Sequence, residues 1–398
     1  MSYEVIIDGP INLSGMGNVT RGFIKCLAEI PEFKVKVCDN LISPMLGHKG
    51  LPKEEIELYD SLSKTDVTTN SLYIQIGAPK IFKKTPFKYN IGWTLFESDG
   101  FHPYYVQQCN NMVDEIWTAS KFNKQTFSIS GVNKKIRVVP PFVDTDSFKP
   151  GIEKLNISNL RKFTFQSNFD FSWRKGMDVL LHAYWDEFKD TDDVCLLLKV
   201  FTGDESVEAQ KHLMNQINFT KKRLSLDDKK TAPVLFFGSF LDQNYMPNFS
   251  NTCDCYVSAS RGEGFNIPLA EALSLEKQCI STRWSAPIEF INKKNGYLLD
   301  LDPKQPLVPI TDQYQLKTEP FYERQQMANP SIDHLKQLMH IVVKEKEENL
   351  HLDKVRLGRE TIINKFSRDQ IKKILKESII DVFENNKEEI NQDSKGLF

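Results

Sequence analysis

The sequence predicts an α/β protein with two Rossmann-like domains, each built on a parallel sheet, and a ligand-binding cleft between them. Two observations support this prediction. Short apolar runs alternate with amphipathic stretches along most of the chain, as parallel strands joined by helices do. The alternation stops at Pro140-Pro141 and starts again at Phe163. With 398 residues, the chain is long enough for two domains that each bury a core.

The first half alternates strands and helices, and we expect it to form one domain over residues 1–145. Its predicted strands are apolar runs rich in β-branched and aromatic residues: 3–7, 33–38, 72–76, 89–96, 115–118 and 136–139. The predicted helices lie between them, at 19–29, at 104–113 and after Ser120, which is a good N-cap residue. This order is typical of a parallel sheet with helical connections.

The second half repeats the pattern, and we expect a second domain over residues 146–365. Strands are predicted at 163–166, 194–200, 234–237 and 254–258, with one helix from about Trp173 and another with Pro268 as its first residue. A polar region at 304–329 precedes a helix at 332–348. For 366–398 we predict a helix at 369–383 that packs back toward the first domain, followed by a flexible charged tail.

Composition excludes several classes of protein. Fifty-one basic and 53 acidic side chains give a net charge of −2, so no overall basic field indicates nucleic acid binding. Seven cysteines without paired metal spacing fit a reduced, cytoplasmic protein, and Cys253 and Cys255 are interpreted as core residues rather than zinc ligands. No apolar run of about twenty residues predicts a membrane span, which leaves peripheral membrane contact as the alternative.

Two glutamates separated by seven residues, Glu263 and Glu271, give the strongest functional signal. Glu263 lies between Gly262 and Gly264 after a predicted strand, and Glu271 lies about one turn into the next helix. A helix N-terminus attracts anions, while carboxylates accept hydrogen bonds from hydroxyl groups. A ligand with phosphate and polyol groups, such as a nucleotide sugar, satisfies both. The simpler interpretation, an acidic residue in a first helical turn, explains Glu271 but not Glu263.

A basic turn at Arg174 and Lys175 gives a second signal. With Ser172 as the N-cap, both cations would lie in the first turn of a helix, where positive charge is unfavourable without an anion. A diphosphate would supply that anion. Lys199, near the end of an apolar strand, is a further candidate, although a lysine at a strand end also commonly extends to solvent.

Gly15 and Gly17 follow the first strand, and Asn18 is a suitable N-cap for the helix after them. Backbone amides in such a loop can approach a phosphate. A dinucleotide fingerprint would instead need a small residue at Thr20, and would use an acid such as Asp39 for the ribose. The NAD-dependent alternative therefore stays open on weaker grounds.

These motifs together resemble the retaining GT-B glycosyltransferases of family 4 (group 1), whose hallmark is two glutamates separated by seven residues. Further stretches resemble the family in the same order along the chain: 15–18, 114–120, 138–144, 173–176, 262–268, 281–285 and 295–298. The resemblance implies GT-B architecture and a nucleoside diphosphate sugar, UDP- or GDP-linked, as donor. It implies no required cofactor and an acceptor that is a glycan, a lipid-linked molecule or a protein.

The resemblance also assigns roles to individual residues. Lys175, Glu263 and Arg174 would be catalytic. The donor would be held by Gly15, Gly17, Lys175, Lys199, Phe240, Glu263, Gly264, Phe265, Asn266 and Glu271, with Glu271 on the ribose and the amides of residues 264–266 toward the donor. The family often has glycine where Asn266 stands.

Three polar residues beyond the strand at 89–96 are acceptor-side candidates: Glu97, Asp99 and His102. The pair Asp144 and Asp146 invites a metal interpretation, but these residues lie in the hinge, and a metal-free mechanism that uses Lys175 and helix dipoles is preferred. Two rival functions stay open. One is a nucleotide-sugar epimerase, hydrolase or phosphorylase, and the other is a non-catalytic GT-B-like binding subunit.

Overall fold

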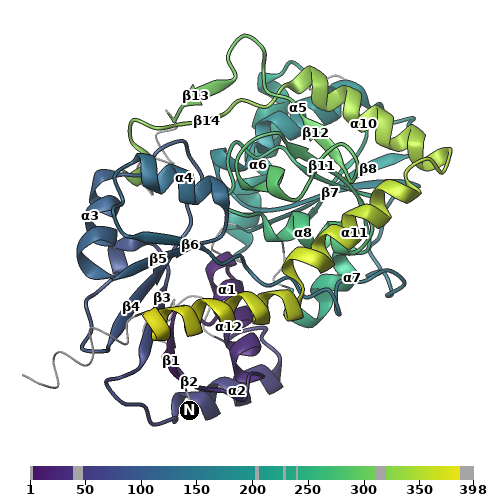
Figure 1. The fold of residues 1–398 in the computed structure, drawn as a ribbon. Helices are drawn as coiled ribbons and strands as arrows, with labels where there is room; N and C mark the ends of the chain where they lie inside the picture. Colours follow the sequence, from purple (N-terminus) through teal and green to yellow (C-terminus); the bar gives the residue numbers. More distant parts are fainter. Residues whose placement is uncertain are drawn as a thin grey trace, which may run out of the picture.

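The computed structural model describes residues 3–38, 48–201, 206–226, 230–238, 241–310 and 320–385. The chain folds into two α/β halves, each organised around a six-stranded sheet (Figure 1). The strand orders are β2-β1-β3-β4-β5-β6 and β12-β11-β10-β7-β8-β9, and neighbouring strands are parallel throughout both sheets. The predicted fold class is confirmed.

The N-terminal half follows the predicted alternation closely. Its strands are β1 (Tyr3–Asp8), β2 (Phe33–Cys38), β3 (Leu72–Ile76), β4 (Tyr89–Trp93), β5 (Glu115–Thr118) and β6 (Lys135–Val138). Its helices are α1 (Gly15–Ala28), α2 (Lys53–Ser63), α3 (Pro103–Met112) and α4 (Lys121–Ile129), with a 3-10 turn η1 (Pro79–Ile81). Ser120 caps α4 as predicted, because its side chain accepts a hydrogen bond from the Asn123 amide at 3.2 Å.

The C-terminal half contains β7 (Phe163–Asp170), β8 (Val194–Phe201), β9 (Val234–Phe237), β10 (Cys255–Ser258), β11 (Gln278–Thr282) and β12 (Tyr297–Leu299). Its helices are α5 (Met177–Glu187), α6 (Val207–Arg223), α7 (Met246–Ser250), α8 (Ile267–Ser274), α10 (Ile332–Glu347) and α11 (Leu352–Phe366). Short 3-10 turns are η2 (Trp173–Lys175), η3 (Gln243–Tyr245) and η4 (Ala286–Glu289).

Several elements were not predicted. Helices α2, α6, α7 and α11 have charged or mixed sequences whose apolar positions are sparse, so their helical period is weak in the sequence. No strand was predicted in the polar region between β12 and α10. It contains the antiparallel pair β13 (Leu307–Pro309) and β14 (Gln326–Ala328) and the turn η5 (Pro320–Tyr322).

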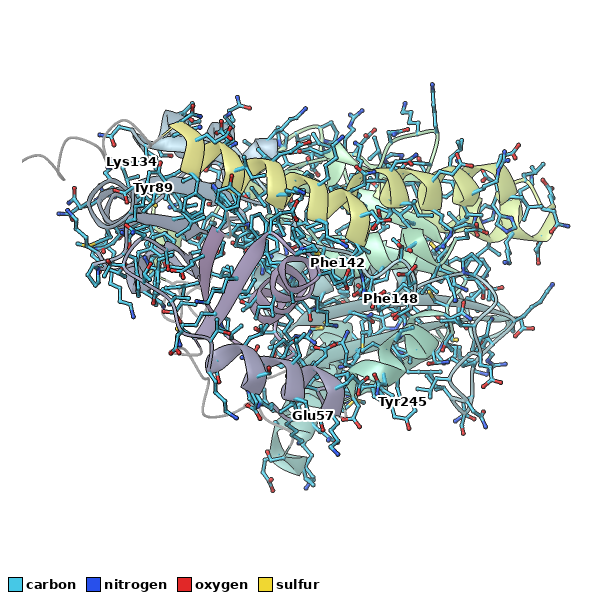
Figure 2. The ribbon with its side chains drawn as sticks, turned by 60° about the horizontal axis from the view of Figure 1, so that its bottom comes forward. Glu57, Tyr89, Lys134, Phe142, Phe148 and Tyr245 are labelled. Atoms are coloured by element: carbon cyan, nitrogen blue, oxygen red, sulfur yellow. The ribbon has the colours of Figure 1, made fainter. Side chains whose placement is uncertain are left out.

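Helix α12 (Arg368–Asn385) leaves the C-terminal half and lies against the N-terminal half, beside α1 (Figure 1). Ion pairs join Arg368 to Glu29 at 2.8 Å and Arg137 to Asp381. Side-chain sticks fill the space between α12 and the N-terminal sheet (Figure 2). Helix α12 thereby packs the C-terminal end of the described chain against the N-terminal half.

A continuous apolar core joins the two halves. One cluster includes Phe23 of α1 and Trp93 of β4, and it extends into the C-terminal half through Phe265 and Phe366. Phe142, on the connection between the halves, packs against α1, where a Cβ at Gly22 would meet the Phe142 Cβ at 3.0 Å (Figure 2). The relative position of the sheets is therefore set by packing, not by the connecting segment alone.

All seven cysteines are free thiols, and Cys253 and Cys255 are buried in the core. In the part of the chain that the structure describes, no helix combines the length and apolar character that crossing a membrane requires.

Candidate functional site

A cleft of about 390 Å³ lies between the two halves. The N-terminal half lines it with the segment that leads into α1, including Ser14 and Gly15. The C-terminal half lines it with the ends of β7 and β8, with the start of α8 and with residues after β9. Side chains at the carboxyl ends of parallel strands thus face the first helix of the other half, which is where open α/β sheets bind ligands.

The first turn of α1 presents its amino end to this cleft. Ser14 is the N-cap, and its hydroxyl accepts a hydrogen bond from the Gly17 amide at 3.1 Å. The prediction that Asn18 caps this helix was wrong, since the helix begins at Gly15. Gly15 lines the cleft, whereas Gly17 is required for packing because a Cβ there would lie 2.2 Å from the Asn12 carbonyl oxygen.

Lys175 reaches the cleft from the other side. It lies in the 3-10 turn η2, and α5 begins only after Gly176, whose φ of +67° and close approach to the Ala259 carbonyl oxygen exclude a side chain. The prediction of a helix capped by Ser172 was therefore wrong in detail, because Ser172 makes no side-chain capping bond. The basic residues nevertheless form a tight turn at the cleft edge.

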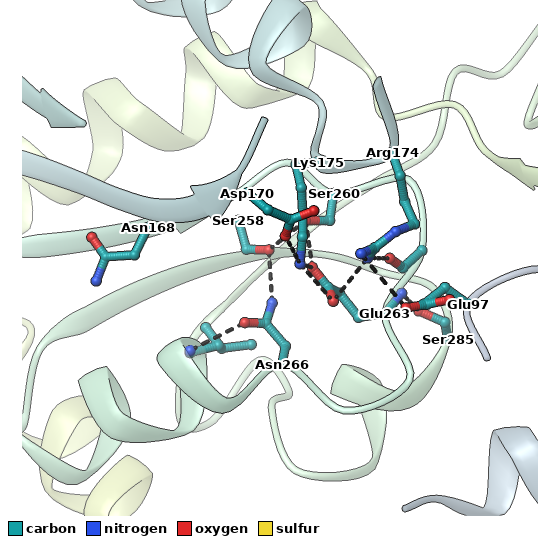
Figure 3. A network of polar contacts seen from close by, with 12 residues as sticks. Glu97, Asn168, Asp170, Arg174, Lys175, Ser258, Ser260, Glu263, Asn266 and Ser285 are labelled. Atoms are coloured by element: carbon teal, nitrogen blue, oxygen red, sulfur yellow. Dashed lines mark hydrogen bonds and ion pairs between the residues drawn. The ribbon is translucent and has the colours of Figure 1, made fainter. Parts of the chain in front are cut away.

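Glu263 is held by a dense set of partners (Figure 3). Its carboxylate accepts hydrogen bonds from Lys175 at 2.8 and 3.1 Å, from the Ser260 hydroxyl at 2.8 Å and from Arg174 at 3.2 Å. Burial alone would raise the pKa of Glu263, but the charges of Lys175 and Arg174 outweigh burial and hold the pKa below its usual value. Glu263 is thus an ionised carboxylate that anchors Lys175.

Arg174 extends away from the cleft. Its side chain donates to the Gly262 carbonyl at 2.9 Å and pairs with Glu97 of the N-terminal half at 3.5 Å, and the residue is only 8% exposed. It does not line the cleft that Lys175 lines. Figure 3 shows Glu263 between the two cations, with Glu97 on the far side of Arg174.

Glu271 has the opposite environment. It lies half-buried on α8 and lines the cleft, and within the described residues its carboxylate has no hydrogen-bond partner. Burial, together with the nearby charge of Asp144, raises the pKa of Glu271 to about 8. An unsatisfied acceptor at a cleft wall is suited to a ligand that brings hydroxyl donors.

The loop between the two glutamates fits closely against the N-terminal half. A Cβ at Gly262 would lie 2.0 Å from the Glu97 carbonyl oxygen, and one at Gly264 would lie 2.9 Å from Leu95 Cβ. The Phe265 side chain is buried in the shared core. Among the described residues, the backbone N–H groups of Gly264, Phe265 and Asn266 have no hydrogen-bond acceptor.

Asn266 has a backbone conformation that few residues other than glycine adopt. It has φ +83° and ψ +70°, a left-handed conformation that glycine adopts without strain and that asparagine tolerates better than most residues. Its side chain also caps α8 by accepting from the Leu269 amide at 3.2 Å, and it donates to Ser258 at 2.9 Å. Asparagine therefore fits this position, where the resemblance led us to expect glycine.

The remaining predicted residues divide into three groups. Lys199 lines the cleft at the end of β8. Asp99 accepts a hydrogen bond from the Gln326 amide at 2.7 Å, and His102 caps α3 at the Tyr104 amide, so neither lines the cleft. Phe240 and Asp39 lie outside the described residues.

The hinge acids Asp144 and Asp146 do not line the cleft, although the charge of Asp144 acts on Glu271. Asp144 accepts hydrogen bonds from the backbone and side chain of Ser147. Within the ranges that the structure describes, no group of three His, Cys, Asp or Glu side chains is arranged to hold a metal ion.

Sequence reasoning missed several residues of the site. Ser260 hydrogen-bonds Glu263, Ser285 accepts from the Glu263 amide at 3.1 Å, and Asn168 and Gln243 line the cleft. Asn168 could have been found, because it lies near the end of a strand at which the sheet rule places ligands. Ser285 could not, since only the folded chain brings it to Glu263.

Comparison with known families gives one match. Residues 161–307 match the model described as "Glycosyl transferases group 1". This segment contains the basic turn and both glutamates of the motif. No curated protein matches the chain.

Comparison with solved structures shows the fold of the whole chain. A glycosyltransferase from Rickettsia africae superposes with a TM-score of 0.64 at 15% identity, covering 96% of this chain and 99% of that one. Anabaena HepE, in complex with UDP and glucose, gives 0.62 at 12% identity, covering 96% and 100%. Sucrose-phosphate synthase from Thermosynechococcus elongatus gives 0.63 at 13% identity, with the same coverage as HepE.

These neighbours share the two-sheet GT-B architecture with this chain. The family match, which covers all the predicted donor residues except Gly15 and Gly17, agrees with the prediction of an enzyme of the glycosyltransferase type.

Proposed function

We propose that this protein is a cytoplasmic glycosyltransferase of the retaining type that moves a sugar from a nucleoside diphosphate sugar to an acceptor without a divalent metal. The observation that carries the proposal is the convergence of three features on one cleft. These are the amino end of α1, the ammonium group of Lys175 and the unsatisfied carboxylate of Glu271. In one donor, the amino end of α1 would bind the phosphates, Lys175 would stabilise the leaving group, and Glu271 would accept hydrogen bonds from the ribose.

Lys175 and the amino end of α1 would share the diphosphate. They approach the cleft from opposite halves, so a bound diphosphate neutralises positive potential from both. As the bond between the sugar C1 and the diphosphate oxygen breaks, its electron pair passes to the diphosphate, and Lys175 stabilises the added charge. Because these groups supply positive charge to the leaving group, we propose that no metal is needed.

The two glutamates would hold the donor at different points. Glu271 would accept hydrogen bonds from the ribose hydroxyls, and Glu263 would lie beside the transferred sugar together with the open amides of residues 264–266. The acceptor oxygen would bond to C1 on the face that the diphosphate leaves, and its proton would pass to the departing diphosphate oxygen. The motif's resemblance to retaining enzymes supports this stereochemistry.

UDP is the first nucleotide to test, because HepE and the pneumococcal transferase GtfA are described in complex with UDP. Lys199 and the glycine Gly15 would complete the donor site. We also propose domain limits at 1–145 and 146–365, with 366–398 returning to the first domain, and the packing of α12 on α1 supports this division.

The decisive experiment compares Lys175→Ala with Lys162→Ala, a control at the opposite end of β7 whose side chain is 70% exposed. A thermal-shift screen with UDP, GDP, ADP and their sugars first identifies the donor. We expect Lys175→Ala to lower kcat by about 10²–10³-fold with that donor, in buffer with a metal chelator, and Lys162→Ala to leave it unchanged.

Three outcomes would contradict the proposal. These are a melting temperature that no nucleotide shifts, a Lys175→Ala variant that transfers sugar at the wild-type rate, and loss of activity in the presence of the chelator. Proton NMR of the first product tests for retention, because the coupling constant of the proton on C1 identifies the anomer formed. Efficient epimerisation or hydrolysis without acceptor would assign the site to one of the rival enzyme functions.

A further inference from the structure

An arm of the C-terminal half crosses to the N-terminal half near the candidate site. It comprises the described residues 300–310 and 320–330, between β12 and α10, and includes η5 and the strand pair β13 and β14. In Figure 1 the pair lies apart from the C-terminal sheet, on the side of α3 and α4. The arm therefore bridges the two halves on the side of the cleft away from the hinge.

Aromatic stacking docks the arm on the N-terminal half. The Phe321 ring stacks on Tyr105 with centroids 4.2 Å apart, and the Tyr322 ring stacks on Phe96 at 4.6 Å. Backbone contacts fix the register, since the Asp99 amide donates to the Gln326 carbonyl at 3.1 Å and Asp99 accepts from the Gln326 amide. Stacked rings and paired backbone groups give a specific contact, not only an apolar one.

The other end of the arm is fixed to the donor side of the cleft. The Ala328 amide donates to the Arg261 carbonyl at 2.9 Å, and the Arg261 amide donates to the Arg174 carbonyl at 2.7 Å. The Arg261 side chain forms a bidentate pair with Asp178 at 2.7 and 2.9 Å. These bonds tie the arm to the turn that carries Lys175.

A chain of side chains runs from the arm to Lys175. The Tyr322 hydroxyl donates to Glu97, and Glu97 pairs with Arg174 at 3.5 Å. Arg174 pairs with Glu263 at 3.2 Å, and Glu263 accepts from Lys175 at 2.8 Å. The side chains of Glu97, Arg174, Glu263 and Lys175 are 9–14% exposed, so water screens their interactions weakly.

We propose that Tyr322 and Glu97 are positioning residues for Lys175 and act through Arg174 and Glu263. Arg174 then has no contact with the diphosphate. Glu97 draws Arg174 toward the N-terminal half, and Glu263 is shared between Arg174 and Lys175 in one geometry. This inference rests on the proposed function, since it assigns a cause to the placement of the cation that meets the leaving group.

The inference predicts an effect confined to the phosphate distal to the nucleoside. UMP and UDP share the base, the ribose and the first phosphate, so their affinity ratio isolates the second phosphate. We expect Tyr322→Phe and Glu97→Gln each to lower the ratio Kd(UMP)/Kd(UDP) about tenfold, the size of one hydrogen bond to a charged group. Tyr104→Phe is the matched control, because it removes a hydroxyl from the same docking surface and keeps the ring that faces Phe321.

Isothermal calorimetry on the full chain gives both constants. If Tyr322 had only a structural role, its substitution would weaken the binding of UMP and UDP equally and leave the ratio Kd(UMP)/Kd(UDP) unchanged. Melting temperatures verify that each variant is folded, and Glu97→Gln keeps the volume of the side chain if Tyr322→Phe loosens the arm. An unchanged ratio in both folded variants overturns the inference.

The same data separate this inference from the proposed function. If wild-type protein binds none of UDP, GDP and ADP, the proposed function fails before the arm is tested. If wild-type protein binds UDP and Lys175→Ala weakens that binding, while Tyr322→Phe and Glu97→Gln match Tyr104→Phe, the donor site stands and the positioning chain does not.

Discussion

The two glutamates of the motif lie eight positions apart in the sequence, yet their environments differ in every respect that sets their chemistry. Glu263 is surrounded by hydrogen-bond donors and two cations, and its pKa is lowered. Glu271 has no hydrogen-bond partner among the described residues, and its pKa is raised to about 8. Without a ligand, the Glu263 carboxylate is thus bonded to protein groups, whereas the Glu271 carboxylate is available to a ligand.

One motif can therefore combine a structural and a binding function. A carboxylate that neutralises buried cations stabilises the fold whether or not a ligand is present. A carboxylate left unsatisfied in a cleft costs stability until a ligand supplies donors. The same substitution at the two positions should therefore change the free energy of unfolding differently.

The largest expected effect is on stability. Replacing Glu263 by Ala leaves Arg174 and Lys175 without their shared carboxylate, and loss of one partner from a buried pair costs about 3–5 kcal/mol. Glu271→Ala breaks no hydrogen bond between described residues and removes an unsatisfied half-buried group, so we expect the free energy of unfolding at pH 7 to stay unchanged or to rise. Urea unfolding at pH 7 measures both, and equal losses would contradict the comparison.

The second effect is on the pH dependence of stability. Glu271 titrates near pH 8 in the folded protein and near its ordinary value of 4.5 when unfolded, so the folded state binds a proton that the unfolded state has lost. Its contribution is present in full below pH 4.5 and is lost as the pH rises through 8. The loss is at most about 1.4 kcal/mol per pH unit between those values.

Glu271→Gln should remove this component. We expect the stability difference between wild type and variant to change steadily in urea titrations at pH 5.5, 7.0 and 8.5, with the variant gaining relative stability as the pH rises. A difference that stays constant over this range would show that Glu271 titrates normally. Glu263 supplies no such slope there, because its lowered pKa keeps it ionised in both states.

A third, smaller effect accompanies ligand binding. If ribose hydroxyls donate to Glu271, they favour its ionised form, and UDP binding at pH 7.5 should release up to about one proton. Calorimetry in two buffers of different ionisation enthalpy measures the number released. Glu271→Gln should abolish the release and Ser260→Ala, on the side of Glu263, should preserve it; proton uptake by wild type would contradict this assignment.

The smallest effect concerns the residue that begins the helix of Glu271. Asn266→Gly should cost only a few tenths of a kcal/mol, because glycine fits the left-handed conformation and is a fair N-cap. Asn266→Ala should cost about 2 kcal/mol, since alanine loses the cap and strains the backbone. Thermal unfolding ranks the three proteins, and a glycine variant less stable than the alanine variant would exclude this explanation.

Much of the fold followed from local patterns. Apolar runs located the six strands of the N-terminal sheet and four of the six in the C-terminal sheet, and Ser120 located the start of α4, because strand burial and helix capping depend on neighbours in the sequence. Helices such as α2 and α11 were not found, because their apolar positions are too few to show a helical period and contacts with other elements stabilise them. The start of α1 was misplaced by four residues, since Asn18 and Ser14 are both suitable caps and only the backbone path selects one.

Strand periodicity, glycine turns and charge are local properties, so they were sufficient to predict the fold class and the residue types at the donor side of the cleft. What each of these residues contacts follows only from the folded arrangement of the two halves. That arrangement joined Lys175 to Glu263, turned Arg174 toward Glu97, and left Glu271 facing the cleft without a partner. Those contacts join segments more than 70 residues apart, such as the 88 between Lys175 and Glu263, and they depend on burial that strengthens some charges and leaves others unsatisfied.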